Sequence, residues 1–209
     1  KCFIMAYLFK ALKLKNFVEI GVYRGRSLFQ IAVAVKDNGG HAFGIDPYLN
    51  SYVQEKDATN EMKQLISNTL SNENFEDLYE DVCFLINQFN FEDTINLIRD
   101  TSKNAVESLK NVQIDMLHID GNHDEIFVRE DAKNYIPIVS TNGIIVFDDI
   151  NWPSVKKVYD EEKKKYPCVF ESESFGILLK ADSTFEDSDI RVKKIIDEAL
   201  ILLERFANV

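Results

Sequence analysis

The sequence lacks the features of a disulfide-framed or membrane-spanning protein. Its three cysteines, Cys2, Cys83 and Cys168, are odd in number, widely spaced and form no C-x-x-C pair. We therefore expect neither a disulfide framework nor a zinc site, and we predict a reducing, cytoplasmic location. The longest apolar runs, such as ALILL and GIIVF, are far too short to cross a bilayer, so no membrane partner is expected.

Positive charge is also scarce. The chain has 24 Lys and Arg against 35 Asp and Glu, which gives a formal net charge of -11 at pH 7. A large nucleic-acid footprint needs clustered basic side chains, so no nucleic-acid partner is expected. The start shows no signal-peptide pattern. The chain begins at Lys1 rather than Met, which leaves open a trimmed N-terminus and a missing targeting segment.

Short apolar segments alternate with helical ones along most of the 209 residues. This alternation predicts one α/β domain over 1–209, with a doubly wound, mostly parallel sheet and helices on both faces. The predicted strands are Phe17–Ile20, Ala42–Asp46, Thr94–Ile98, Ile114–Ile119 and Gly143–Asp148. The predicted helices are Ser27–Val35, Ser102–Leu109, Glu125–Tyr135 and Pro153–Lys165. Asn142-Gly143 is a turn signal placed just before the fifth strand.

Three further segments complete the predicted domain. The stretch CVFESESFGILLK at 168–180 indicates two strands joined by a tight turn, hence an antiparallel hairpin. Residues 50–93 are polar and helical in pattern, and they are long for a connection, so we predict a helical insert and a candidate lid. The tail 183–209 is predicted to be a helix, docked on the domain or contacting a second copy in a homo-oligomer. Its apolar positions are Ile190, Ile195, Ile196, Leu200 and Leu203.

Two motifs suggest a nucleoside-binding crevice. In FVEIGVYRGRSLFQIA, an apolar strand carries Glu19, and Gly21, Gly25 and Ser27 then lead into a helix. Glycines permit a tight turn close to a ligand, and the helix start offers unpaired N–H groups. In HAFGIDPY, Asp46 ends the next strand about 20 residues further on, where an acid accepts hydrogen bonds from ribose hydroxyls. The alternatives are an ordinary strand-to-helix turn and an aspartate that caps its own turn.

Two other motifs suggest a metal centre. Asp120 and His123 follow one buried strand, and Asp148 and Asp149 follow the next. Parallel strands end at the same edge of a sheet, so these groups should face one crevice. Neighbouring carboxylates repel unless a cation joins them, and Mg²⁺ is the natural candidate for oxygen ligands. His123 is suited to act as a general base near neutral pH. The alternative is a solvated Asp-Asp turn beside a histidine at a helix start.

Together these motifs resemble a known family. E-x-G-x-x-x-G-x-S, G-I-D-P, H-I-D-G-N-H and G-I-I-V-F-D-D, spread over Asn16–Lys180, are similar to motifs of the class I S-adenosylmethionine-dependent methyltransferases. The resemblance is to the metal-dependent O-methyltransferase group of the macrocin (macrolide-sugar) type, and more distantly to the catechol type. It implies a Rossmann-like sheet of seven strands whose last strand is antiparallel.

The resemblance also implies roles for individual residues. S-adenosylmethionine would lie over the glycine turn, with Asp46 on its ribose and the stretch after the third strand near its adenine. The implied cofactor-binding residues are Glu19, Gly21, Gly25, Ser27, Asp46, Asp100 and Ser102. Asp120, Asp148 and Asp149 would hold the metal, and His123 would be the base. The chain departs from the pattern in having only two glycines in the turn, and in having Arg99 where a glycine is frequent.

The predicted function is therefore methyl transfer to a hydroxyl of a small molecule or sugar, with Asp120 and His123 as catalytic residues. A divalent metal, with Mg²⁺ as the first candidate, is expected to assist the transfer. One alternative is a binding module that has lost catalysis. A second is a non-haem iron oxygenase using His118, Asp120 and His123, although a packed strand residue is the simpler interpretation of His118. A third is a nucleotide-dependent oxidoreductase, which the missing third glycine disfavours. Tyr48, Tyr52 and Trp152 lie near strand ends and are candidate acceptor contacts.

Overall fold

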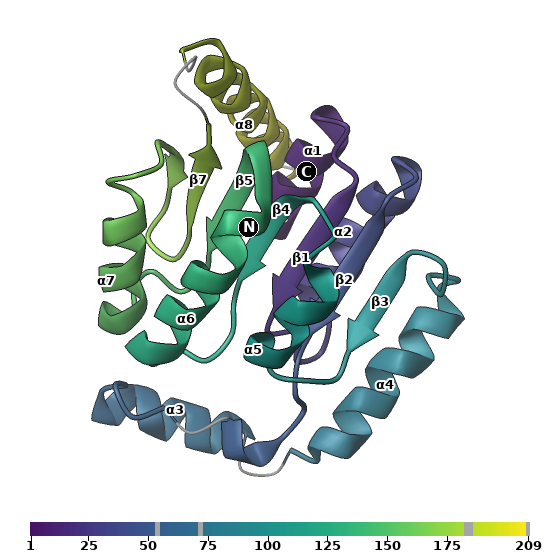
Figure 1. Cartoon of the computed structure of the whole chain (residues 1–209), viewed down its shortest axis with the longest axis vertical. Helices are drawn as coiled ribbons and strands as arrows, with labels where there is room; N and C mark the ends of the chain where they lie inside the picture. The colour runs from purple at the N-terminus through teal and green to yellow at the C-terminus, as the bar shows by residue number, and fades with distance from the viewer. Residues whose placement is uncertain (53–54, 71–72, 182–185, 208–209) are drawn as a thin grey trace.

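A computed structural model describes residues 1–52, 55–70, 73–181 and 186–207, and its centre is a seven-stranded sheet (Figure 1). The strands lie in the order β3-β2-β1-β4-β5-β7-β6. β7 is antiparallel to both of its neighbours, whereas β3, β2, β1, β4 and β5 are mutually parallel. The strands are β1 Asn16–Ile20, β2 His41–Ile45, β3 Ile95–Ile98, β4 Ile114–Ile119, β5 Val139–Phe147, β6 Cys168–Glu171 and β7 Gly176–Lys180. The predicted Rossmann-like sheet with an antiparallel last strand is confirmed.

Helices cover both faces of the sheet, so the chain has two hydrophobic layers. One layer lies under α1, α2, α4 and α8, and the other lies under α5, α6 and α7 (Figure 1). The helices are α1 Cys2–Ala11, α2 Arg26–Asp37, α3 Asn60–Leu70, α4 Phe75–Gln88, α5 Ser102–Ala105, α6 Glu125–Tyr135, α7 Pro153–Glu162 and α8 Glu186–Ala207. Three 3₁₀ turns add η1 Asn50–Tyr52, η2 Val106–Leu109 and η3 Ile136–Ile138. Within the described ranges, no helix combines the length and apolar character needed to cross a bilayer.

The sheet topology fixes where a ligand can bind. From β1 the chain moves outward through β2 and β3, and it then returns to the other side of β1 with β4 and β5. The strand order therefore reverses between β1 and β4. In open α/β sheets a crevice forms beyond the carboxyl ends of the strands at this reversal. The glycine turn after β1 and the Asp120 segment after β4 both lie there.

Two elements differ most from what the sequence pattern indicated, and the predicted helix Ser102–Leu109 is divided into α5 and η2. Helix α1 was not predicted, because its sequence CFIMAYLFKA is apolar nearly throughout and shows little helical contrast. Strand β5 begins at Val139 rather than Gly143, so Asn142-Gly143 lies inside the strand and not before it. Asn142 does have a turn-like φ of 64°, and the pairing of β4 with β5 is irregular at this point. The turn signal therefore marks a bulge within the strand.

The insert and the tail are both helical. The insert forms η1, α3 and α4 in its described part, and its role as a lid stays a prediction. In the tail, α8 packs against α1 and buries Ile195 and Ile196, whereas Ile190 is 64% exposed. Residues 182–185 and 208–209, at the ends of the predicted tail helix, lie outside the described residues.

Candidate functional site

The turn after β1 is held tightly against the end of β4. Gly21 has a φ of +87°, and its N–H donates to the Ile45 carbonyl at 2.9 Å. A Cβ added at Gly21 would lie 2.0 Å from the backbone oxygen of Asp120. Only glycine satisfies both the positive φ and this close approach. The turn and the Asp120 segment therefore form one continuous floor under the crevice.

Asp46 closes the glycine turn from the side of β2. Its Oδ2 accepts hydrogen bonds from the backbone N–H groups of Val22 and Tyr23 at 3.0 and 2.9 Å, and its Oδ1 accepts from Tyr48 N–H at 2.8 Å. A carboxylate has further lone pairs to offer, and Asp46 also lines a cavity. The residue therefore caps its turn and is still placed to meet a ligand.

Two cavities open onto this floor. The larger has a volume of about 720 Å³ and extends from Asp46 past Ser102 to His123. The smaller, of about 580 Å³, lies beside Lys1, Arg26 and Asp148. Four residues line both cavities: Gly21, Tyr23, Asp120 and Asp149. Two ligands bound side by side would therefore meet at the wall that these residues share.

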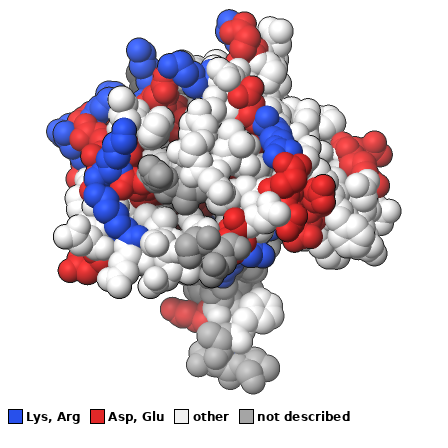
Figure 2. Space-filling view, turned by 90° about the horizontal axis from the view of Figure 1, so that it is seen from below, with Lys and Arg blue, Asp and Glu red and all other residues white. Residues whose placement is uncertain are grey.

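The face that carries these cavities is mixed in charge. Seen from below, acidic and basic side chains lie mainly around its periphery, and much of its centre is formed by uncharged residues (Figure 2). Charged side chains also line the cavities themselves: Asp120 and Asp149 line both of them, and Arg26 lines the smaller one.

The predicted cofactor-binding residues divide into two groups. Gly21, Asp46 and Ser102 line the larger cavity, and Ser27 lines the smaller one. The other three line neither of the two cavities. Gly25 is the N-cap of α2, with a φ of 73°. Asp100 caps its own turn, because its Oδ1 accepts from Thr101 N–H at 2.7 Å and from the side-chain amide of Asn104 at 2.9 Å.

Glu19, the third of these residues, is fully buried and bonded to His118. The two residues face each other on the paired strands β1 and β4, and the Oε1 of Glu19 lies 2.7 Å from the Nδ1 of His118. Burial raises the pKa of Glu19 to about 8 and lowers the pKa of His118 to about 4. At neutral pH the pair is therefore a neutral hydrogen-bonded unit. His118 Nε2 has no hydrogen-bond partner in the described part of the chain.

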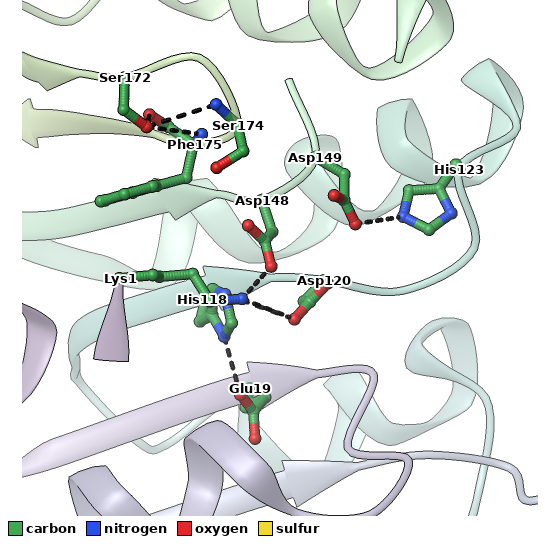
Figure 3. Close-up of polar contacts among 10 residues, drawn as sticks. All are labelled: Lys1, Glu19, His118, Asp120, His123, Asp148, Asp149, Ser172, Ser174 and Phe175. Carbon is green, nitrogen blue, oxygen red and sulfur yellow. Dashed lines mark hydrogen bonds and ion pairs between the residues drawn. The ribbon is translucent and has the colours of Figure 1, made fainter. Parts of the chain in front are cut away.

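The three predicted metal ligands gather beyond β4 and β5 in two groups that share Asp120 (Figure 3). One group brings Asp120 and Asp148 together with His118, and the other brings Asp120 and Asp149 together with His123. The Lys1 ammonium pairs with Asp148 and lies 3.1 Å from Asp120 Oδ2. Asp149 adopts a left-handed φ of 50°, a costly conformation for a non-glycine residue that is concentrated at functional sites.

His123 is held between two carboxylates. Its Nε2 lies 2.9 Å from Asp149 Oδ2, its Nδ1 lies 2.5 Å from Glu55 Oε1, and its ring stacks on Trp152. Burial opposes the charged form, but the hydrogen bonds with Asp149 and Glu55 outweigh it and raise the pKa of His123 to about 9. In this arrangement the ring is therefore an imidazolium at neutral pH.

The candidate acceptor contacts lie at different depths. Tyr52 is 40% exposed and lines the larger cavity. Tyr48 is buried against Tyr79, and Trp152 is buried beneath the His123 ring. Tyr52 alone of the three borders either of the two cavities.

Two further residues at the site were not predicted. Glu55 lies on the polar insert, which carries no recognisable motif, and nothing in the sequence links it to His123. Asp131 lines the larger cavity from α6 and accepts a hydrogen bond from Ser102 Oγ at 2.5 Å. A signal for Asp131 was present, since it falls three residues after Val128 on the buried face of α6.

The buried Asp131 leads to a testable pH dependence. Burial raises its pKa to about 7, so folding favours the protonated carboxyl and wild-type stability should fall as pH rises from about 4 to 7. Asp131→Asn removes this titration. Between pH 5.5 and 8, urea unfolding should show the variant gaining about 2 kcal/mol relative to wild type. Asp37→Asn on the surface is the control, and parallel pH profiles for Asp131→Asn and wild type would contradict the assignment.

Comparison with known proteins defines the class. Residues 18–150 match the model of a family described as a methyltransferase domain, and the chain belongs to that family. This agrees with the seven-stranded sheet and with the crevice at the reversal of strand order. An iron oxygenase does not fit, because the sheet is mainly parallel, and His118 and His123 fall in separate ligand groups among the described residues.

Individual relatives are distant. The chain is 25% identical over 147 residues to an uncharacterized protein, y4gI, of Sinorhizobium fredii (strain NBRC 101917 / NGR234). The match takes in 68% of this chain and 14% of that protein, so the chain spans about a seventh of this relative's length.

Three solved structures share the fold. A putative caffeoyl-CoA O-methyltransferase from Staphylococcus aureus has a TM-score of 0.61 at 17% identity, covering 86% of this chain and 82% of that one. The O-methyltransferase NovP has a TM-score of 0.63 at 14% identity, with 86% and 78% covered. TomG from Streptomyces achromogenes, an O-methyltransferase solved in complex with SAM, has a TM-score of 0.62 at 11% identity, with 87% and 79% covered.

Proposed function

We propose that this domain transfers the methyl group of S-adenosylmethionine to a hydroxyl of a small molecule or sugar, with the help of a divalent cation. The observation that carries the proposal is the pair of cavities that share Gly21, Tyr23, Asp120 and Asp149. A two-substrate transfer requires two pockets whose ligands meet at one point. Asp120 and Asp149 lie at that point, Asp148 lines the smaller cavity, and His123 lines the larger one.

The larger cavity suits the methyl donor. It lies over the glycine turn at the reversal of strand order, where nucleoside ligands bind in this fold. Asp46 borders the place expected for the ribose, and Ser102 and Asp131 border the far end, toward the expected adenine. TomG, with the same fold, was solved in complex with SAM. These features support S-adenosylmethionine as the cofactor.

The smaller cavity suits the acceptor. Its lining includes Arg26, Ser27, Gln30 and Ser174, which offer donors and acceptors for hydroxyl groups. Asp120 and Asp149 line this cavity as well, so an acceptor bound in it would contact the shared wall. This polar lining supports a hydroxylated acceptor. The O-methyltransferase neighbours agree with a hydroxyl acceptor.

The acidic residues fit a divalent cation. The carboxylates of Asp120 and Asp148 draw the Lys1 ammonium between them, which shows that the position attracts positive charge. We propose that Asp120 and Asp148, together with Asp149 from the second group that shares Asp120, hold a divalent metal, with Mg²⁺ as the first candidate for oxygen ligands. When bound, the cation supplies Lewis acidity that lowers the pKa of the acceptor hydroxyl.

The chain's own residues would then move the proton. In the transfer the acceptor oxygen forms a bond to the methyl carbon while the carbon–sulfur bond breaks, and the electron pair stays on sulfur in S-adenosylhomocysteine. The hydroxyl proton passes to His123 Nε2. For this step the ring must be neutral and must exchange its contact with Asp149 for the acceptor. Glu55 keeps hold of Nδ1, which fixes the ring orientation with Nε2 toward the reaction.

Calorimetric binding of S-adenosylhomocysteine, with and without Mg²⁺, tests the cofactor assignment directly. We expect a dissociation constant in the micromolar range, as is ordinary for a preformed pocket of this size. Absence of binding under both conditions would rule out the proposed function. Binding without transfer to any hydroxylated acceptor would instead favour a binding module that has lost catalysis.

Replacing His123 tests its role as the base. His123→Asn is expected to lower kcat by about 10²- to 10⁴-fold, the usual contribution of general base catalysis. The dissociation constant for S-adenosylhomocysteine should change less than about tenfold, because His123 is one of many residues that line the larger cavity and the glycine turn and Asp46 remain. His41→Asn, at the exposed start of β2, is the matched control. An unchanged kcat in His123→Asn would exclude a catalytic role.

A further inference from the structure

The orphaned nitrogen of His118 faces the acidic residues. His118 is fully buried, and Nε2 makes no hydrogen bond within the described part of the chain. It lies 3.7 Å from Asp120 Oδ2, too far for a hydrogen bond (Figure 3). A buried polar atom without a partner destabilises the folded state. This nitrogen faces the carboxylates, so it is placed to bind a cation held between them.

The strand geometry builds this arrangement. Residues two apart on a strand point to the same face, so His118 and Asp120 share one face of β4. His118 pairs with Val146 and Ile119 with Phe147, which brings Asp148 beside Asp120 just beyond the paired strands. The ligand atoms of His118, Asp120 and Asp148 all lie within 4.8 Å of one another. Donors that each lie about 2.1 Å from one ion are separated by about 3.0–4.2 Å, so small side-chain movements would bring the three atoms onto a single metal ion.

Two other contacts support a metal site at this position. The Lys1 ammonium already lies between Asp120 and Asp148, at the place where a cation would sit. Glu19 occupies the opposite nitrogen of the His118 ring, Nδ1, at 2.7 Å. A carboxyl group bonded to one imidazole nitrogen fixes the ring and directs the other nitrogen to a metal, as around many metal-binding histidines. His118 therefore has both the position and the supporting bond of a ligand.

We propose that His118 Nε2 is a nitrogen ligand of the cation held by Asp120 and Asp148, and that the resulting His-Asp-Asp site prefers Mn²⁺, Co²⁺ or Zn²⁺ to Mg²⁺. This inference rests on the proposed metal-assisted function and narrows its metal. An imidazole ligand suits first-row transition metals, whereas Mg²⁺ favours oxygen ligands only. The two carboxylates balance the charge of a divalent ion.

Pulsed electron paramagnetic resonance of the wild-type protein loaded with Mn²⁺ tests this ligand. We expect a nitrogen coupling to the bound Mn²⁺ that changes when the protein is made with ¹⁵N-histidine. Calorimetry on the same protein should give Mn²⁺ an affinity at least about tenfold above that of Mg²⁺. Bound Mn²⁺ without a histidine nitrogen coupling would overturn the proposal. Both measurements use the wild-type chain, so they do not depend on the folding of any variant.

A matched pair of variants separates the two histidines near the carboxylates. His118→Asn should remove the nitrogen coupling and weaken Mn²⁺ binding at least about tenfold, with Mg²⁺ binding little changed. His123→Asn should keep the coupling, and its loss in that variant instead would overturn the assignment to His118. S-adenosylhomocysteine binding is measured in EDTA on every sample. Failure of that binding rules out the proposed function, whereas intact binding without nitrogen coupling rules out only the His118 ligand.

Discussion

Asp120→Asn is expected to lower kcat for methyl transfer by about three orders of magnitude, which would be among the largest effects of any single substitution in this chain. Asp120 lines both cavities and belongs to both groups of metal-ligand side chains. Its loss should therefore remove the cation and misplace the reacting oxygen together. The dissociation constant for S-adenosylhomocysteine should change less than about tenfold, because the glycine turn and Asp46 remain.

Steady-state kinetics with Asp37→Asn as the control separates this effect from a general change of charge. Asp37 pairs with Lys10 on the surface and lines neither cavity. Metal binding should be lost in Asp120→Asn and kept in Asp37→Asn. If Asp120→Asn kept a tenth or more of the wild-type kcat, Asp120 would have no part in the chemistry.

The second large effect is on stability, for Gly21→Ala. The new Cβ would lie 2.0 Å from the carbonyl oxygen of Asp120 and 2.6 Å from its carbonyl carbon, and both are backbone atoms that cannot rotate away. The φ of +87° adds strain for any side chain. We expect unfolding in urea to show a loss of about 3–5 kcal/mol, together with loss of S-adenosylhomocysteine binding as the turn and the end of β4 separate.

Gly39→Ala is the matched control for Gly21→Ala. Gly39 also has a positive φ, of +64°, but the nearest atom to its added Cβ is the flexible end of Lys15 at 3.8 Å. This variant carries only the conformational cost, about 1–2 kcal/mol. Equal losses in the two variants would show that the close approach to Asp120 contributes nothing.

The sequence predicted best the elements whose pattern is local. β4 and α6 have the predicted bounds, Ile114–Ile119 and Glu125–Tyr135, because one is an apolar run interrupted only by Asp115 and His118 and the other has a clear helical period. Helix α1 escaped prediction because its residues are apolar on nearly every side. Its burial depends on packing against α2 and against α8, which lies at the other end of the sequence.

The residues of the candidate site also divide into those that the sequence pattern predicted and those that depend on contacts between distant segments. Asp120, Asp148 and Asp149 were placed together from the sequence because parallel strands end at one edge of the sheet. The hydrogen bond between His123 and Glu55 was not predictable, since Glu55 lies 68 residues earlier on an insert without a motif. The raised pKa of His123 depends on that contact. The strand period placed His118 beside Asp120, but only the paired strands show that its Nδ1 is already bonded to Glu19.

The bond between Glu19 and His118 also has a consequence for how the sheet assembles. Shifting β4 by one residue against β1 would turn every side chain of the slipped strand to the opposite face. Glu19 would then be left in an apolar layer without its imidazole partner, at a cost of roughly 1–3 kcal/mol. A chain that pairs β1 and β4 out of register is therefore destabilised by more than the loss of apolar packing alone. The pair therefore favours the register in which Asp120 reaches the crevice.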